Sequence, residues 1–349
     1  MKKILLVKTS SMGDVIHNLP VASDILSVLP GSHIDWVVEE SFAAVPRLHP
    51  GVRRLFHVAL RRWRANWWRA AARREIARFA DELKAETYDA VIDTQGLLKS
   101  ALVTWCARGA RYGLDWKSAR EPLAPFYDRT FSVPWTLHAV ERNRALAAQA
   151  LDYAVPNGVN YGITARAASF EWLPAGSYVV LLHASSAPRK LWPEGHWIDL
   201  GRKLAADQRF CVLPWGNPEE RGRSERLARE IPRAVVPPQL ALAEVAALLA
   251  GAGAVVGVDT GLTHLAGALK VPTVGVYCDT DPAATGLYGC ARAVDLGGIG
   301  RSPSVDEVST ALERLVSAAD ERPSLIPSPS PQGEGQARAS PLHSGEERG

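Results

Sequence analysis

Short runs of Val, Ile and Leu alternate with longer amphipathic stretches along most of this chain. The apolar runs are nearly continuous, which is typical of parallel strands covered on both faces. The predicted strands are Ile4–Val7, Ile34–Val38, Arg54–Val58, Ala90–Asp93, Tyr178–His183, Phe210–Leu213, Ala254–Val258 and Thr273–Tyr277. The helices predicted between and after them are Val15–Val28, Arg64–Ala85, Leu97–Ala107, Val140–Leu151, Gly195–Ala206, Pro218–Ile231, Leu242–Ala250, Leu262–Leu269 and Val305–Ala318.

The alternation is interrupted near residues 155–177, where the segments VPNGVNYG and LPAGS supply turn residues. Repeated strand–helix units on both sides of this break predict an α/β protein with two Rossmann-like domains, whose parallel sheets face each other across a cleft. We place the domains at residues 1–165 and 166–321. From Pro323 onward, 14 of 27 residues are Pro, Ser or Gly. Residues 322–349 are therefore predicted to be a disordered tail with no catalytic role.

The apolar segments indicate a cytoplasmic protein that does not cross a membrane. The longest uncharged apolar run, Val245–Val258, is shorter than the roughly 18–20 residues that a membrane span requires. The N-terminus begins like a signal peptide, but Lys8 ends its apolar stretch after four residues, where about 7–15 are needed. The four cysteines form no CxxC pair, and we predict neither disulfides nor a metal site.

Positive charge is concentrated in the first half of the chain. The net charge is +3, yet the segment from Arg47 to Arg78 contains ten arginines and a single acid, Glu75. Three tryptophans, Trp63, Trp67 and Trp68, lie among these arginines. A solvated helix face would accommodate the arginines but not the tryptophans. Arginine with tryptophan suits an anionic membrane surface, and no nucleic-acid motif accompanies the segment.

A loop of small polar residues, TSSMGD at residues 9–14, joins the first predicted strand to the first predicted helix. Ligands of open α/β sheets bind at the carboxyl ends of the strands. Gly13 would let the backbone approach such a ligand, and the Asp14 carboxylate would face the cleft. Alternatively, Asp14 is only an N-cap residue and Gly13 only a turn residue. The loop matches neither GxGxxG nor a P-loop.

A similar loop, GVDTGLTH at residues 257–264, leads from another strand into a helix. Helix N-termini attract anions, so Thr260 and Gly261 mark a candidate diphosphate site. His264 lies one turn into the helix and can face the same ligand. A capping Asp259 or Thr260 beside a surface histidine would explain the same pattern.

Two further strand-end loops carry groups that suit a nucleotide. In HASSAPRKLWP, the hydroxyls of Ser185 and Ser186 and the ammonium of Lys190 could hold phosphate oxygens, unless the loop is only a polar surface. In LPWGNPEE, Glu220 could accept hydrogen bonds from ribose hydroxyls. Glu220 could equally be a first-turn acid favoured by the helix dipole.

Five motifs of this chain, taken in order, resemble those of the lipopolysaccharide heptosyltransferases of glycosyltransferase family 9. They are TSSMGD, DTQGLLKSA, HASS with RKLWP, PWGNPEE and VDTGLTHLA. The match is best to the members that begin the inner core, and it covers Lys3 to about Ala318. The resemblance implies a GT-B fold, an N-terminal acceptor domain and a C-terminal sugar-nucleotide domain. It implies ADP-L-glycero-β-D-manno-heptose as donor, the first Kdo of Kdo2-lipid A as acceptor, inversion at the anomeric carbon, and no metal or other cofactor.

The resemblance also assigns roles to positions of this chain. Asp14 matches the family's proposed general base. Ser185 and Ser186 stand where the family has threonines, and both keep the hydroxyl. The implied donor-binding residues are Ser185, Ser186, Lys190, Glu220, Asp259, Thr260, Gly261 and His264. Leu240 is expected to pack on adenine. The residues expected to bind the phosphates and carboxylates of the acceptor, or to lie beside it, are Ser10, Gly13, Arg61, Arg62, Arg64, Gln95, Lys99 and Arg120.

The basic segment is then expected to bind the inner membrane from its cytoplasmic side, with the nearby tryptophans touching lipid. Three other functions stay open. The protein could be a family-9 enzyme that adds the second heptose, although TSSMGD argues against this. It could be a GT-B-type sugar-nucleotide epimerase, which needs no membrane acceptor. It could also be a Rossmann-like binding protein without turnover.

Overall fold

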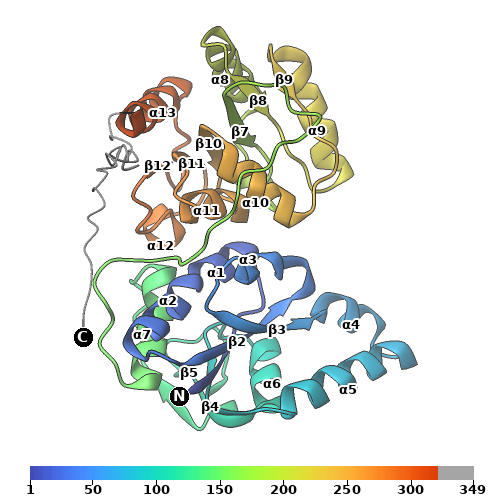
Figure 1. Ribbon diagram of the computed structural model, residues 1–349, viewed down its shortest axis with the longest axis vertical. Helices are drawn as coiled ribbons and strands as arrows, with labels where there is room; N and C mark the ends of the chain where they lie inside the picture. Colours follow the sequence, from blue (N-terminus) through green and yellow to red (C-terminus); the bar gives the residue numbers. More distant parts are fainter. Residues whose placement is uncertain (321–349) are drawn as a thin grey trace, which may run out of the picture.

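The computed structural model of the protein describes residues 1–320, which form two α/β lobes (Figure 1). Each lobe contains one six-stranded sheet in which neighbouring strands pair in parallel. The predicted fold class, α/β with two Rossmann-like halves, is confirmed. The tail predicted for residues 322–349 lies outside the described residues.

The N-terminal lobe is built on β1 (Lys3–Val7), β2 (His33–Glu39), β3 (Val52–Val58), β4 (Thr87–Asp93), β5 (Arg108–Leu114) and β6 (Arg129–Phe131). Their order in the sheet is β3-β2-β1-β4-β5-β6. The direction of winding therefore reverses between β1 and β4, and the loops after these two strands meet at this switch point. Ligands of open α/β sheets bind at such a point.

The helices of this lobe are α1 (Met12–His17), α2 (Leu19–Val28), α3 (Ala44–Arg47), α4 (Leu60–Asn66), α5 (Ala70–Lys84), α6 (Leu98–Cys106) and α7 (Ala139–Leu151), with short 3-10 turns at Glu40–Phe42 and Ala124–Phe126. Two predicted helices are divided in the structure. Asn18 ends α1 and starts α2, where Pro20 lacks the N–H that a continuous helix would use. The extended backbone of Arg69 separates α4 from α5.

The C-terminal lobe is built on β7 (Tyr178–Leu182), β8 (Phe210–Val212), β9 (Ala234–Val235), β10 (Ala254–Val258), β11 (Thr273–Tyr277) and β12 (Ala293–Gly297). The sheet order is β12-β11-β10-β7-β8-β9, so its switch point lies between β7 and β10. Its helices are α8 (Glu194–Ala206), α9 (Pro218–Glu230), α10 (Leu242–Gly251), α11 (Gly261–Ala268), α12 (Pro282–Thr285) and α13 (Val305–Asp320), with a 3-10 turn at Pro188–Lys190.

Four strands, β5, β6, β9 and β12, are absent from the sequence prediction. They occupy the outer positions of the sheets, where side chains are only partly covered. Their sequences, such as RGARYGL for β5, therefore lack the continuous apolar pattern of the central strands. The prediction identified the centre of each sheet correctly and missed most of the outer strands.

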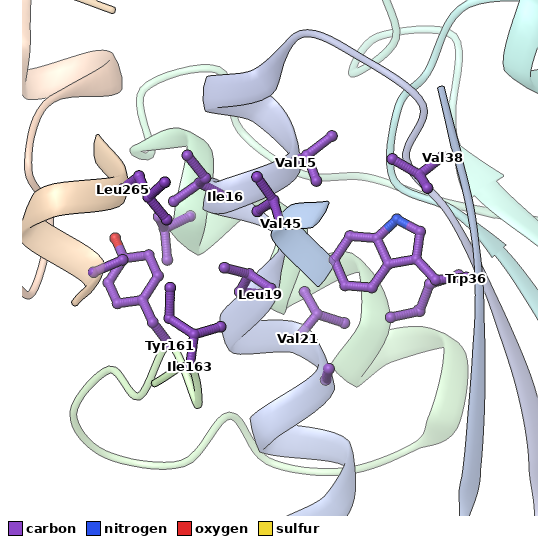
Figure 2. Close-up of a cluster of buried hydrophobic side chains, with 14 of the residues drawn as sticks. Val15, Ile16, Leu19, Val21, Trp36, Val38, Val45, Tyr161, Ile163 and Leu265 are labelled. Carbon is purple, nitrogen blue, oxygen red and sulfur yellow. The ribbon is translucent and has the colours of Figure 1, made fainter. Parts of the chain in front are cut away.

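A single buried cluster connects the two lobes. Ile16 of α1 and Leu265 of α11 are fully buried in it, and Tyr161 of the segment that joins the lobes is buried beside them. Figure 2 shows Leu265 beside Ile16 and Tyr161. The Tyr161 hydroxyl also donates a hydrogen bond of 2.8 Å to the carbonyl of Tyr288 in the C-terminal lobe. The relative position of the lobes is therefore fixed by apolar packing as well as by this bond.

We predict that Leu265→Ala lowers the free energy of unfolding by about 2–5 kcal/mol, because it leaves a cavity where the two lobes pack. Urea unfolding followed by tryptophan fluorescence would measure the loss. Leu315→Ala on α13, where the side chain is only partly buried, is the matched control and should cost less. Equal costs for the two variants would contradict a stabilising role for the contact between lobes.

Candidate active site

The loop after β1 is held in place by the loop after β4. The Gln95 Oε1 atom accepts hydrogen bonds from the backbone N–H groups of Thr9 and Ser10, at 2.9 and 3.0 Å. The Ser10 hydroxyl accepts a hydrogen bond of 2.5 Å from the Lys99 ammonium. The switch point of the first sheet therefore brings together Ser10, Gln95 and Lys99, three of the residues predicted for the acceptor site.

Asp14 is the third residue of α1, and Ser11 takes the N-cap position. Its Oδ2 atom accepts hydrogen bonds from the Ser11 backbone N–H at 2.8 Å and from the Ser11 hydroxyl at 2.9 Å. Asp14 is thus part of a capping box, and it is not the N-cap residue of the alternative interpretation. The same carboxylate also lines a cavity, so its capping contacts fix the orientation in which it meets that cavity.

This polar cavity, of about 290 Å³, lies between the two lobes. The N-terminal lobe contributes Lys8, Arg120 and Arg142 to its wall, and the C-terminal lobe contributes Ala284 and Thr285 of α12. The Arg142 guanidinium lies over the Trp135 ring, 3.7 Å from its centroid. Three cations thus share a cavity with the Asp14 carboxylate. Such a wall suits an anionic ligand that presents a proton donor to Asp14.

Lys8 is the most deeply placed of these cations, with an exposed fraction of 5%. Its ammonium donates hydrogen bonds to the Thr94 carbonyl at 2.7 Å and to the Asn143 Oδ1 atom at 3.2 Å. Burial lowers the pKa of Lys8 below its ordinary value, although the carboxylates of Asp14 and Asp93 act in the opposite direction. Lys8 therefore couples the first strand, the β4 loop and α7 around the cavity.

Sequence analysis does not single out Lys8, Arg142 or Asn143 as site residues. The role of Lys8 could have been predicted from the sequence, because Lys8 lies at the carboxyl end of the first strand, where α/β sheets bind ligands. Arg142 and Asn143 carry no comparable local signal. The face of α7 that reaches the cavity is defined by the order of the strands, which the sequence pattern does not give.

In the second lobe, the loops after β7 and β10 meet at the other switch point. The Ser185 hydroxyl donates a hydrogen bond of 3.0 Å to the Asp259 carbonyl, and the Lys190 ammonium donates one of 2.6 Å to Asp259 Oδ2. The His264 Nε2 atom lies 3.5 Å from Asp259 Oδ1. Burial alone would raise the pKa of Asp259, but the His264 and Lys190 side chains outweigh it and hold this pKa well below its usual range. Asp259 is therefore an anion that positions a lysine and a histidine.

The other predicted donor residues lie on α9, at the start of α11, and in the loops after β7 and before α10. Thr260 is the N-cap residue of α11 and Gly261 its first residue, while Ser186 is exposed next to Ser185. Glu220 lies at the start of α9, where its carboxylate accepts a hydrogen bond of 2.7 Å from a backbone N–H of the preceding loop. Leu240 is partly buried against the core.

The two switch points face each other where α1 meets α11. A Cβ atom on Gly13 would lie 3.3 Å from the His264 ring, and a Cβ atom on Gly261 would lie 2.7 Å from the Met12 side chain. The His17 and His264 ring centroids are 4.6 Å apart. Because His264 also approaches Asp259, the Asp14 loop and the Lys190–Asp259 pair belong to one site that the two lobes share.

The basic segment predicted to meet the membrane runs from the end of α3 through β3 and α4 into α5. The Arg62 guanidinium forms ion pairs with Glu40 at 3.2 Å and with Glu75 at 2.7 Å, whereas Arg61 and Arg64 are exposed at the mouth of a second cavity. Trp63 is buried, and its indole N–H donates to Glu75 at 2.9 Å. Trp63 is therefore covered at the surface that would meet a membrane, whereas Trp67 and Trp68 are exposed there. Within residues 1–320, no helix has both the length and the apolar character needed to cross a bilayer.

Two Rossmann-like lobes that share one site, with a carboxylate on the first and a lysine beside a helix N-terminus on the second, are the arrangement of a GT-B glycosyltransferase. A family model described as "Glycosyltransferase family 9 (heptosyltransferase)" matches residues 76–313. The chain belongs to glycosyltransferase family 9, as the five motifs predict.

Known heptosyltransferases are similar to this chain over most of its length. Lipopolysaccharide heptosyltransferase 1 of Pseudomonas aeruginosa is 49% identical over 298 residues, which are 84% of this chain and 83% of that protein. The structure of the E. coli heptosyltransferase WaaC with ADP is 42% identical with a TM-score of 0.83, and the match covers 90% of this chain and 99% of that one. The E. coli structure with ADP-2-deoxy-2-fluoro heptose is also 42% identical, with a TM-score of 0.78, covering 91% and 99%.

We predict that acid weakens the junction between the lobes. Burial, and after it the positive charge of His264, lower the pKa of His138 from 6.5 to about 4. The unfolded chain binds a proton below pH 6.5, so the stability that neutral His138 contributes is complete above pH 6.5 and is lost as the pH falls through 4. Its full size is about 3 kcal/mol.

The measurement is the free energy of unfolding between pH 7 and pH 4. His138 also accepts a hydrogen bond of 3.1 Å from the Val140 N–H at the start of α7. His138→Asn keeps an acceptor for this cap and removes the titrating group, so its stability should fall less steeply with acid than that of the unmodified protein. The same slope for both proteins would contradict the prediction.

Proposed function

We propose that the protein transfers L-glycero-D-manno-heptose from ADP-L-glycero-β-D-manno-heptose to the first Kdo of Kdo2-lipid A. The observation that carries this proposal is the Asp14 carboxylate in a cavity that both lobes line and that contains Lys8, Arg120 and Arg142. The names of the relatives support heptose transfer in lipopolysaccharide synthesis. The ADP and fluoro-heptose complexes of the E. coli enzyme support the donor.

The cationic wall fits an acceptor sugar that carries a carboxylate. Lys8, Arg120 and Arg142 would bind the Kdo carboxylate, because charge-assisted hydrogen bonds to a carboxylate are the strong ones. The buried position of Lys8 fixes one end of that carboxylate. A neutral sugar would offer these cations no negative charge, so the wall would select the acceptor as well as bind it.

Asp14 would act as the general base. It would accept the proton of the acceptor hydroxyl while that oxygen attacks the anomeric carbon of the heptose. The bond from this carbon to the diphosphate oxygen breaks at the same time, and ADP departs with the electron pair. One displacement of this kind inverts the configuration at the anomeric carbon. A positioned base typically contributes about 10²–10⁴-fold to the rate.

The second lobe would stabilise the departing diphosphate. Lys190 and the N–H groups at the start of α11 supply positive charge and hydrogen-bond donors at its switch point, and the Ser185 hydroxyl would turn from the Asp259 carbonyl to donate to the diphosphate. No metal or cofactor is required in this proposal. Asp259 is occupied by Lys190 and His264, so its role is to position these two residues. Glu220 would bind the ribose and Leu240 the adenine.

The acceptor is a membrane lipid, so the protein would work attached to the cytoplasmic face of the inner membrane. Exposed Arg61 and Arg64 would meet anionic headgroups, and exposed Trp67 and Trp68 would lie at headgroup depth. Each cation near the surface contributes about 1 kcal/mol toward an anionic membrane.

Family membership favours transfer over the epimerase and over a binding protein without turnover. The proposal is tested by incubating the protein with ADP-heptose and Kdo2-lipid A and measuring the mass of the lipid. The expected product carries one added heptose. Transfer only to an acceptor that already bears a heptose would favour the second-heptose alternative. Consumption of ADP-heptose without any lipid product would contradict the proposal.

We predict that Asp14→Asn lowers kcat by about 10²–10⁴-fold and leaves ADP affinity nearly intact, because the amide cannot accept the proton. Steady-state kinetics and calorimetric ADP titration would measure the two effects. Ser11→Ala is the control, since it removes one capping contact to Asp14 and keeps the carboxylate. A loss in Ser11→Ala as large as that in Asp14→Asn would assign the effect to the shape of the loop.

We predict that replacing Arg61 and Arg64 together with Gln raises the KM for the acceptor at least several-fold and leaves the KM for ADP-heptose nearly unchanged. Arg62→Gln should have a smaller effect, because Arg62 is already bound by Glu40 and Glu75. Arg229→Gln, on an exposed position of α9, controls for the loss of surface charge. Equal effects on the two KM values would reject the assignment of Arg61 and Arg64 to the acceptor.

A further inference from the structure

A second cavity, of about 470 Å³, lies in the N-terminal lobe among α4, α5 and α6. Each helix contributes apolar side chains from one face: Leu60 and Trp63 from α4, Ile76 and Phe79 from α5, and Leu102 and Cys106 from α6. Within each helix these residues are three or four positions apart, so they lie above one another on the same side. The cavity therefore has hydrocarbon walls on three sides.

Three cations also line this apolar cavity. Arg61, Arg64 and Lys99 line it together with Ser10, whose hydroxyl is bound by Lys99. The one acid in this lining, within residues 1–320, is Glu39, and its carboxylate already accepts a hydrogen bond of 3.2 Å from the Leu60 backbone N–H. The charges at the cavity therefore favour an anion next to an apolar group.

Ser10 lines both this apolar cavity and the polar cavity that contains Asp14. The two cavities are thus neighbours along the loop after β1. A ligand with a sugar in the polar cavity and a hydrocarbon chain attached to it would reach the apolar cavity past Ser10 and Lys99.

Large apolar side chains surround the apolar cavity on the protein surface. Trp67, Trp105 and Leu102 are exposed by 64%, 63% and 47%. Leu102 and Trp105 are three positions apart on α6, so they lie on the same face of that helix. Tryptophan is enriched at the water–membrane interface. The apolar walls of the cavity continue into a surface suited to the edge of a bilayer.

From this geometry we infer that the apolar cavity holds a hydrocarbon chain of the acceptor lipid, while Arg61, Arg64 and Lys99 contact its phosphate. The inference rests on the proposed function and adds a second binding site to it. The apolar walls give each buried methylene a favourable contribution to binding. A polar ligand such as free phosphate would leave these walls unused, and the cations at the cavity would not be needed for an uncharged hydrocarbon.

The binding test uses dodecyl phosphate as the probe, with inorganic phosphate as the comparison. We expect dodecyl phosphate to bind the full chain at least tenfold more tightly than inorganic phosphate and to slow the alkylation of Cys106 by N-ethylmaleimide, followed by peptide mass analysis. Leu102→Glu should weaken dodecyl phosphate binding at least tenfold. Cys106→Trp, which fills the cavity with an apolar group, should do the same. Ile299→Glu, on an exposed position of the C-terminal lobe, should not.

The transfer test compares Kdo2-lipid A with its fully deacylated form in the same detergent. We expect the unmodified protein to show a lower KM for the acylated acceptor, and we expect Leu102→Glu to raise this KM several-fold more than the KM for the deacylated acceptor. Transfer to both acceptors with equal KM values, together with no binding of dodecyl phosphate, would overturn the inference and leave the proposed function standing. Dodecyl phosphate binding at Cys106 without transfer to either acceptor would instead reject the proposed function.

Discussion

The close approach of α1 and α11 is the contact on which the site depends. Gly13 and Gly261 leave the space that His264 and Met12 occupy, so the starts of two helices from different lobes lie against each other. Both helices follow the central strands of their sheets, β1 and β10, directly. A carboxylate on one helix and the lysine–aspartate pair beside the other are thereby placed in one site.

The histidine rings beside the contact of α1 with α11 are packed against one another. The rings of His17, His138 and His264 form a buried group, and the His138 ring stacks on Tyr288. Burial lowers the pKa of His17 and of His138, which keeps both rings neutral between the lobes. The charged side chains lie on either side of these rings. Lys8, Arg120 and Arg142 line the polar cavity, and Lys190 and Asp259 form the pair in the second lobe.

The central strands and the loops at both switch points could be predicted from the sequence, because buried parallel strands and strand-end loops each leave a local pattern. Ser10, Gln95 and Lys99 were expected near one another and are in contact. Most of the outer strands could not be found, since their half-exposed side chains have no distinct period. The pairing of Arg62 with Glu40 and Glu75 could not be found either, because Glu40 lies outside the basic segment and Glu75 lies on α5, whose position against α4 the sequence does not give. The number of arginines in a segment does not show which of them form ion pairs with carboxylates in the folded protein.

The contacts of Tyr288 limit how the two lobes can move relative to each other. Tyr288 is held twice, by the hydroxyl of Tyr161, which lies in that segment, and by the His138 ring of the first lobe. Tyr288 therefore ties the connecting segment and the start of α7 to the C-terminal lobe at one point. The lobes cannot move apart at this point without losing a hydrogen bond and a ring contact together.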